Sequence, residues 1–322
     1  MKIIPEHSYE IKNLNLPRID GDFSVTFRIT DSCNLKCEYC FWNAGIHYDY
    51  KDIKITIEEL FKFFKHEKMD NIIFYFHGGE ASTHPRLFDI FRYLHEMKNM
   101  YNINIIIEFQ TNLAMSNLCD ILEYIDLLNI SYHYDELIKH QKHQVFMDNW
   151  EYLCKIQYQI NTLDIMLENV KDVDIFHNNI LKLLQYDNIS NSEMIYAFCH
   201  YSNNPETYTK HIEFYKMHNK NEQQYIIDNK IYNTNDLFEK GLDCQGWKCD
   251  AGIQSIVVNG NGDVFNCGIH MTNYTNRKIG TPYTNLINDK HHHIKLKVLH
   301  QQGTICKWDY CGGDFYLPRI KK

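Results

Sequence analysis

The chain has little of what marks an exported protein, a membrane protein or a nucleic-acid-binding protein. It contains no run of 18 apolar residues, and Glu6, Glu10 and Lys12 interrupt its amino-terminal segment. Neither a transmembrane helix nor a signal peptide is therefore predicted. An excess of positive charge is also lacking, because 33 Lys and Arg are outnumbered by 41 Asp and Glu and the formal net charge is -8, whereas nucleic-acid binding needs a basic surface. We expect a cytoplasmic protein that binds neither a membrane nor a nucleic acid.

The chain is also poor in proline and has no low-complexity linker. With only 6 prolines among 322 residues, its parts are expected to pack together rather than to move as separate units. Cysteine, by contrast, is abundant, with 11 residues. In a chain without an export signal, so many cysteines indicate reduced thiols and metal binding rather than a disulfide framework.

Three of these cysteines lie close together directly after an apolar segment. Cys33, Cys37 and Cys40 are separated by three and two residues. Three such thiolates can hold three irons of a four-iron, four-sulfur (4Fe-4S) cluster and leave the fourth iron open to another ligand. Two alternatives use the same residues. A structural zinc site favours two-residue spacings and needs a fourth nearby ligand, and an ordinary ferredoxin cluster favours two-residue spacings and a distant fourth cysteine.

A second motif follows about forty residues later. Residues 71–77 form an almost continuous apolar run, which predicts a strand buried on both faces, and Gly78, Gly79 and Glu80 follow it. The glycines would let the backbone approach a ligand closely, and Glu80 supplies an anion for an amino group. In this order, the three cysteines and the Gly-Gly-Glu segment resemble the motifs of radical S-adenosylmethionine (radical SAM) enzymes.

This resemblance implies a cofactor set and a type of reaction. S-adenosylmethionine binds the open iron, and an electron from a donor such as flavodoxin or ferredoxin cleaves it to a 5'-deoxyadenosyl radical, which abstracts hydrogen from an unreactive carbon. The resemblance places Tyr39 near the adenine and assigns Gly78, Gly79 and Glu80 to the methionine amine. The alternative is a non-catalytic iron-sulfur or zinc protein with a binding or sensing role, which would have no need of the Gly-Gly-Glu segment.

Apolar strands alternate with amphipathic helices along the first two thirds of the chain. Strands are expected over residues 24–30, 71–77, 103–109, 127–133, 163–167 and 194–199. A capping box of Thr56 and Glu59 predicts the start of a helix that buries Ile57, Leu60, Phe61 and Phe64, and Leu87, Ile90, Phe91 and Leu94 predict a second. Six strand-helix repeats predict an α/β fold, a partial (β/α)6 TIM-like barrel.

Ligands of such a barrel bind at the carboxyl ends of its strands. Asn112 follows the third strand, and Ser131 and His133 lie at the end of the fourth. Each can hydrogen-bond the cofactor or the substrate, although Asn112 can equally form a turn and His133 can be a packed imidazole.

Five further cysteines crowd into the last quarter of the chain, around a hairpin expected over residues 253–266. The region resembles the auxiliary-cluster domains called SPASM and twitch. It has too few cysteines for the full SPASM pattern, so one additional 4Fe-4S cluster is expected, held by Cys249, Cys267, Cys306 and Cys311. A structural zinc site with the same four ligands is the alternative. Cys244 is left as an extra ligand, a hydrogen donor or an inert thiol, and residues 291–293, three histidines, are expected to be a solvated polar stretch.

These assignments divide the chain into four parts. They are an amino-terminal extension (1–20), the radical SAM barrel (21–201), a bridging helical segment (202–240) and a small α+β cluster domain of twitch or SPASM type (241–322).

The resemblance to twitch and SPASM enzymes also suggests the class of substrate. Many of them modify ribosomally made peptides by oxidation, cross-linking or epimerisation, so a peptide is the first hypothesis. Only 32 residues precede Cys33, which is too few for the separate peptide-recognition domain that many of these enzymes carry. The alternative is a small polar metabolite such as an aminosugar, an aminocyclitol or a nucleotide.

Overall fold

The structure is a computed structural model. It describes residues 12–13, 23–37, 40, 45–116, 118–167, 173–185, 195–200, 209–210, 213–214, 224–227, 230–233, 247–249, 251, 253–267, 272–273, 278–279, 282–302, 304–305 and 319–321.

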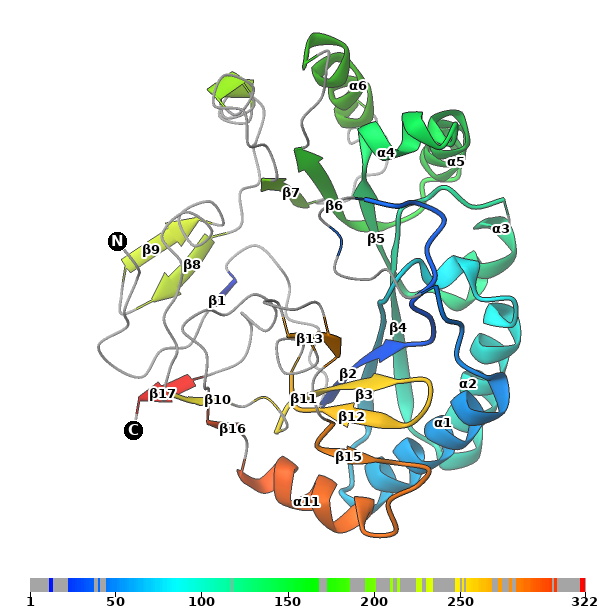
Figure 1. The fold of residues 1–322 in the computed structure, drawn as a ribbon, viewed down its shortest axis with the longest axis vertical. Helices are drawn as coiled ribbons and strands as arrows, with labels where there is room; N and C mark the ends of the chain where they lie inside the picture. The colour runs from blue at the N-terminus through cyan, green and yellow to red at the C-terminus, as the bar shows by residue number, and fades with distance from the viewer. Residues whose placement is uncertain are drawn as a thin grey trace.

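A curved sheet forms the centre of the molecule (Figure 1). Six of its strands are parallel and lie side by side in chain order. They are β2 (Phe23–Arg28), β3 (Asn71–Phe76), β4 (Asn104–Thr111), β5 (Leu127–Tyr132), β6 (Ile160–Leu167) and β7 (Ile195–His200). The six predicted strands and the parallel sheet are confirmed, as expected for a partial barrel.

Helices connect these strands and cover the outer side of the sheet (Figure 1). They are α1 (Tyr50–His66), α2 (Leu87–Tyr101), α3 (Leu118–Ile121), α4 (Tyr134–Lys139), α5 (His143–Lys155) and α6 (Val173–Gln185), with 3-10 turns η1 (Ala81–Thr83) and η2 (Leu122–Tyr124). The apolar positions predicted for the first two helices are buried. In the core, the rings of Phe61 and Phe74 stack between α1 and β3, and burial of such aromatic rings is a main source of stability.

The strands have two different faces. In β3, Ile72, Phe74 and Phe76 are fully buried, whereas the residues between them are only partly buried. The prediction of a strand buried on both faces was therefore wrong for β3. One face packs under the helices, and the other lines the inner side of the curved sheet, because successive side chains of a strand point to opposite faces.

Helix α1 begins earlier than predicted. Asp49 caps it, and its side chain accepts a hydrogen bond from the Lys51 amide at 2.7 Å. The predicted capping box was wrong. Thr56 lies inside the helix, and its hydroxyl donates to the Gly260 carbonyl oxygen at 3.4 Å. The helix extends about two turns further toward its amino terminus because Asp49 satisfies an otherwise unpaired amide and Ile53 continues the buried face. Glu59 consequently projects from the middle of α1.

The carboxyl-terminal hairpin extends the same sheet. Strands β11 (Ser255–Asn259) and β12 (Asp263–Phe265) are antiparallel, as predicted, and Gly262 adopts a left-handed φ of +84° in the turn. Strand β11 pairs in parallel with β2, and β15 (Thr284–Asn285) pairs with β12. Helix α11 (His292–Gln302) follows. The hairpin that we expected in a separate cluster domain therefore belongs to the barrel sheet.

Three small antiparallel sheets complete the described chain. Strands β8 (Gln224–Ile227) and β9 (Lys230–Asn233) form a hairpin with β1 (Lys12–Asn13) on its edge. The helical expectation was therefore wrong for these residues, because two short β-forming runs flank the turn-forming residues Asp228 and Asn229. The other sheets pair β10 (Trp247–Cys249) with β16 (Thr304–Ile305) and β17 (Arg319–Lys321), and β13 (Thr272–Asn273) with β14 (Lys278–Ile279).

Within the described part of the chain, no helix combines the length and the apolar character that crossing a lipid bilayer requires.

Candidate active site

The three clustered cysteines lie in the loop that follows β2. The side chain of Cys37 is 6% exposed, and those of Cys33 and Cys40 are half-buried. A hydrogen bond joins two of these residues, since the Cys40 amide donates to the Cys37 carbonyl oxygen at 3.0 Å. Burial raises the pKa of the Cys33 thiol to about 12, so a thiolate at this position needs a cation to compensate its charge. Tyr39, predicted to lie near the adenine, is outside the described residues.

The Gly-Gly-Glu segment packs directly against this loop. The Gly79 amide donates to the Thr30 carbonyl oxygen at 3.1 Å, and the Glu80 amide donates to the Ser32 carbonyl oxygen at 2.7 Å. A Cβ atom on Gly79 would lie only 2.1 Å from the Ser32 oxygen, and Gly78 has a φ of +149° with the Thr30 oxygen 2.5 Å from its Cβ position. The structure thus gives both glycines a role that the sequence analysis missed, which is to let two loops meet backbone to backbone.

Glu80 is anchored at the end of β4. Its carboxylate is 2% exposed and accepts hydrogen bonds from the amides of Asn112 at 2.7 Å and Ser82 at 3.2 Å. Burial raises the pKa of Glu80, and these hydrogen bonds oppose the increase. The carboxylate that we assigned to an amino group therefore also fixes the loop after β4.

Asn112 links that loop to the cysteines. Its Nδ2 atom donates to the Asn34 side-chain oxygen at 2.6 Å and lies 3.9 Å from the Cys33 sulfur. Asn34 in turn donates to the Ala114 carbonyl oxygen at 2.7 Å. Asn112 therefore lies beside the cysteine loop, and its role in binding stays a prediction. Asn34 was missed, because a lone asparagine between two cysteines carries no distinctive sequence signal.

His133, at the end of β5, lies on the other side of the same loop. Its Nδ1 atom is 3.7 Å from the sulfur of Cys37. Burial lowers the pKa of His133 to about 4, so the imidazole is neutral at pH 7. Asn112 and His133 therefore contact different cysteines of one loop.

Ser131 belongs to a polar network on the inner face of the sheet. Gln110 donates through Nε2 to the Ser131 hydroxyl at 2.6 Å and to a carboxylate oxygen of Asp164 at 3.3 Å, and it accepts from the Tyr75 hydroxyl at 3.0 Å. Burial raises the pKa of Asp164 to about 6. Tyr75, Gln110 and Asp164 were missed from the sequence, although Tyr75 and Asp164 are polar residues that alternate with apolar ones inside predicted strands and Gln110 directly follows a third predicted strand.

A buried ion pair supports the cluster loop from β2. Arg28 and Asp31 bond through their side chains, and they are 0% and 2% exposed. Desolvation lowers the pKa of Arg28, while the Asp31 carboxylate opposes this change. This pair lies beside the Gly-Gly-Glu segment, since the Arg28 Cγ atom is 3.7 Å from the Gly78 Cβ position. The sequence alone did not identify this ion pair.

A family model described as the Radical SAM superfamily matches residues 27–177. This range contains both motifs and the strands that carry the residues described above. Residues 27–177 form a radical SAM domain. The superfamily implies a 4Fe-4S cluster and S-adenosylmethionine as cofactors.

Solved structures agree with this domain at the level of the fold. Native anSMEcpe with bound AdoMet and the Kp18Cys peptide is 16% identical and aligns over 84% of this chain and 80% of its own, with a TM-score of 0.51. Streptococcus suis SuiB bound to S-adenosylmethionine is 13% identical and aligns over 87% of this chain and 66% of its own, with a TM-score of 0.53. Identities this low show a shared fold alone. A search of curated protein sequences found no match to the chain.

The radical SAM domain has residues that fit its implied cofactors. Three thiols from one loop are suitable ligands for three irons of a cluster, and this loop lies at the carboxyl ends of the strands, where barrels bind their ligands. Metal binding would also stabilise the buried Cys33 thiolate, which is otherwise unfavourable.

Of the five carboxyl-terminal cysteines, two lie in the described part of the chain. Cys267 is half-buried just after β12 and packs against Ala251. Cys249 is described only as part of the β10 backbone, and Cys244, Cys306 and Cys311 lie outside the described residues. The auxiliary site stays a prediction.

Proposed function

We propose that this protein is a radical SAM enzyme that abstracts hydrogen from an unreactive carbon of its substrate. The main support for this proposal is the contact between the loop that carries Cys33 and the loop of residues 78–80. The Glu80 amide donates a hydrogen bond to the Ser32 carbonyl oxygen across this contact. When bound, the cluster supplies the electron that cleaves S-adenosylmethionine to the 5'-deoxyadenosyl radical. A one-electron donor such as flavodoxin or ferredoxin would reduce it.

The chain's own residues bind and orient the reactants. Cys33, Cys37 and Cys40 hold three irons, and Asn112 and His133 position the loop that carries them. Glu80 offers a buried carboxylate to the cofactor amine, and its two backbone hydrogen bonds keep it in place. A positioned anion of this kind binds an ammonium group more strongly inside a protein than in water.

For the substrate, we propose a ribosomal peptide, modified by oxidation, cross-linking or epimerisation. Gln110, Ser131 and Tyr75 offer donors and acceptors on the inner face of the sheet, which suits the amide groups of a peptide backbone. Support from known structures is limited to the fold, which is shared with anSMEcpe, solved with a peptide.

A small polar metabolite is the second candidate. One observation favours it, namely the carboxyl of Asp164 on the same inner face, with its pKa raised by burial to about 6. A carboxylate in this position can bind the amino group of an aminosugar or an aminocyclitol.

We further propose that the carboxyl-terminal cysteines Cys249, Cys267, Cys306 and Cys311 hold one auxiliary 4Fe-4S cluster of twitch type, with zinc as the competing metal. The position of Cys267 supports this proposal, because it directly follows a hairpin that extends the barrel sheet. A cluster there can accept an electron from a substrate radical.

Cofactor cleavage tests the central proposal. The protein, reconstituted anaerobically with iron and sulfide, is incubated with S-adenosylmethionine and a strong reductant, and 5'-deoxyadenosine is measured by mass spectrometry. Changing Cys33, Cys37 or Cys40 to Ala should abolish the product. Cys119→Ala is the matched control, because this thiol is exposed on α3. Product formation at the parent rate by the Cys33 variant would refute the assignment.

Two further measurements test the proposed substrate class and the proposed auxiliary cluster. Peptides and aminosugars are compared for their ability to increase 5'-deoxyadenosine formation above the uncoupled rate, and the active class identifies the substrate. Iron content should fall from about eight to about four atoms per chain in Cys267→Ala. Unchanged iron with loss of zinc would instead support a structural zinc site.

A further inference from the structure

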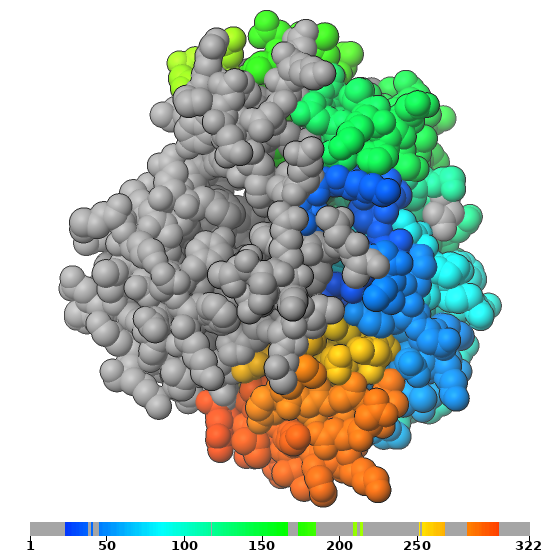
Figure 2. Space-filling view, viewed as in Figure 1, coloured from blue at the N-terminus to red at the C-terminus, as the bar shows by residue number. Residues whose placement is uncertain are grey.

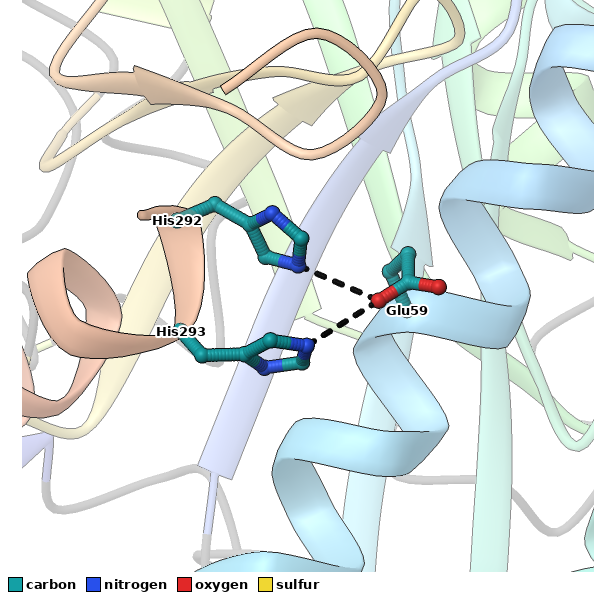
Figure 3. Close-up of side chains that lie close together, drawn as sticks. All are labelled: Glu59, His292 and His293. Atoms are coloured by element: carbon teal, nitrogen blue, oxygen red, sulfur yellow. Dashed lines mark hydrogen bonds and ion pairs between the residues drawn. The ribbon is translucent and has the colours of Figure 1, made fainter. Parts of the chain in front are cut away.

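A second group of metal-ligating side chains lies far from the cysteine loop. Glu59 projects from the middle of α1, and His292 and His293 begin α11. Figure 3 shows both imidazoles pointing toward the same carboxylate oxygen. The Nε2 atoms of His292 and His293 each lie 3.1 Å from Oε2 of Glu59. The expectation of a solvated histidine stretch was therefore wrong for His292, which is largely buried, whereas the side chain of His293 is 49% exposed.

The hydrogen bonds of His292 identify which of its nitrogens is free to bind a cation. Its Nδ1 atom lies 2.7 Å from the carbonyl oxygen of Asp289. A carbonyl oxygen only accepts hydrogen bonds, so Nδ1 carries the proton. In the neutral ring, Nε2 then has a lone pair, and this lone pair faces the carboxylate of Glu59. Two acceptors at this distance require a proton or a cation between them.

The two oxygens of the Glu59 carboxylate have different partners. Lys62 bonds Oε1 of Glu59, which leaves Oε2 to the two histidines. The cluster therefore presents one carboxylate oxygen to two imidazole nitrogens, each 3.1 Å away.

We propose that Glu59, His292 and His293 bind a divalent transition-metal ion of the zinc class. The three ligand atoms all lie within 4.8 Å of one another, and a tetrahedral zinc ion with bonds of about 2.0–2.1 Å needs ligand atoms about 3.3 Å apart. Two imidazoles and one carboxylate suit zinc, cobalt or nickel, whereas magnesium and calcium prefer oxygen ligands alone. Water takes the fourth position.

The rest of the structure holds this site in shape. The Asp289 carbonyl orients the His292 ring as an outer partner of a metal ligand does. The carboxylate of Asp289 is itself fixed by Thr284 and Lys295, each at 2.7 Å, and it accepts a hydrogen bond from the His291 amide at 2.9 Å. Glu59, for its part, lies inside a regular helix. Little rearrangement is therefore needed for binding.

The bound ion would join two distant parts of the chain. Glu59 and His292 are separated by 233 positions, and on the face shown in Figure 2 the surface of the carboxyl-terminal segment meets that of α1. Helix α1 follows the cysteine loop, whereas α11 follows the β11–β15 part of the sheet. A metal here would act as a structural cross-link between the start of the radical SAM domain and the carboxyl-terminal segment, on the outer side of the sheet and separate from the proposed reaction.

Zinc binding by the full-length, cluster-reconstituted protein tests this proposal. Zn2+ is titrated in competition with a chromophoric chelator, and the parent is compared with Glu59→Gln, His293→Asn and the matched control His291→Asn. His291 is an exposed neighbour outside the cluster. Thiol sites are common to all four proteins and cancel in the comparison. We expect the first two variants to lose one site, or at least tenfold in its affinity, and the control to keep it. Identical titrations in all four would overturn the proposal.

Cobalt distinguishes the ligand type independently of affinity. Co2+ at this site should give visible absorption bands without the near-ultraviolet charge-transfer band of thiolate ligands, and His293→Asn should remove these bands. Since the His293 side chain is 49% exposed, this substitution should leave the fold intact, which circular dichroism verifies. Bands that persist in His293→Asn, or that appear only together with thiolate charge transfer, would show that cysteines are the ligands and would overturn the assignment.

Discussion

Replacing Gly79 by Ala should separate the two loops that form the candidate active site. The added Cβ would lie 2.1 Å from the Ser32 carbonyl oxygen and 2.7 Å from the Asp31 carbonyl carbon. Both are backbone atoms, so no flexible side chain can move aside. An ordinary contact requires the loops to move apart by about 1 Å, which breaks the bonds from Gly79 to Thr30 and from Glu80 to Ser32.

The size of the effect follows from these contacts. Overpacking a close-packed region costs about 1–3 kcal/mol, and each lost hydrogen bond costs about 0.5–1.5 kcal/mol. The free energy of unfolding should therefore fall by about 2–6 kcal/mol. Because Ser32 is adjacent to Cys33, cofactor cleavage should fall as well. Urea denaturation measures the first effect and formation of 5'-deoxyadenosine the second.

Gly45→Ala is the matched control, because this residue needs glycine for a different reason. Gly45 has a left-handed φ of +63°, and no atom lies within 4 Å of its Cβ position. Only the conformational cost applies, about 1–2 kcal/mol, and cofactor cleavage should be retained. If Gly79→Ala lost no more stability than Gly45→Ala and kept full activity, the argument from loop contact would be wrong.

Three more substitutions test other parts of the structure. Asn149→Ala removes two hydrogen bonds, from Nδ2 to the carbonyl oxygens of Leu113 at 2.8 Å and Met115 at 2.7 Å, and should cost about 1–3 kcal/mol in urea denaturation while weakening S-adenosylmethionine binding. Asp164→Asn should stabilise the protein by about 2–3 kcal/mol at pH 8 and should have no effect on stability below pH 4. Burial raises the pKa of Asp164 to about 6, so ionisation of this carboxyl destabilises the parent protein as the pH rises from about 4 to about 6, and Asn removes that cost. Phe76→Ala, at a fully buried ring in contact with Phe91, should cost about 3–5 kcal/mol in thermal unfolding.

Each of these has an outcome that contradicts it. For Asn149→Ala, unchanged cofactor affinity despite the stability loss would show that the loop after β4 does not depend on this contact. For Asp164→Asn, a stability difference that is independent of pH would show that the carboxyl titrates normally. A cost below about 1 kcal/mol for Phe76→Ala would mean that the core collapses around the missing ring.

The chemistry-bearing motifs and the order of the strands were readable from the sequence. Cysteine spacing and a glycine pair after an apolar run are local patterns. The strands are recognisable as runs of apolar residues, each followed by a segment whose apolar residues repeat at helical spacing. This is why six strands were predicted close to their observed bounds and why the loop with Cys33, Cys37 and Cys40 was located at the end of one of them.

Only the tertiary structure decided which distant residues meet. The inner-face network around Gln110 depends on the register of four neighbouring strands. Asp49 rather than Thr56 caps α1, in part because Thr56 is buried against Gly260, which is distant in the sequence. Glu59 and His292 are 233 positions apart, and each alone reads as an ordinary polar residue. Local propensity carries no information about such contacts, because they form only when the whole chain has packed.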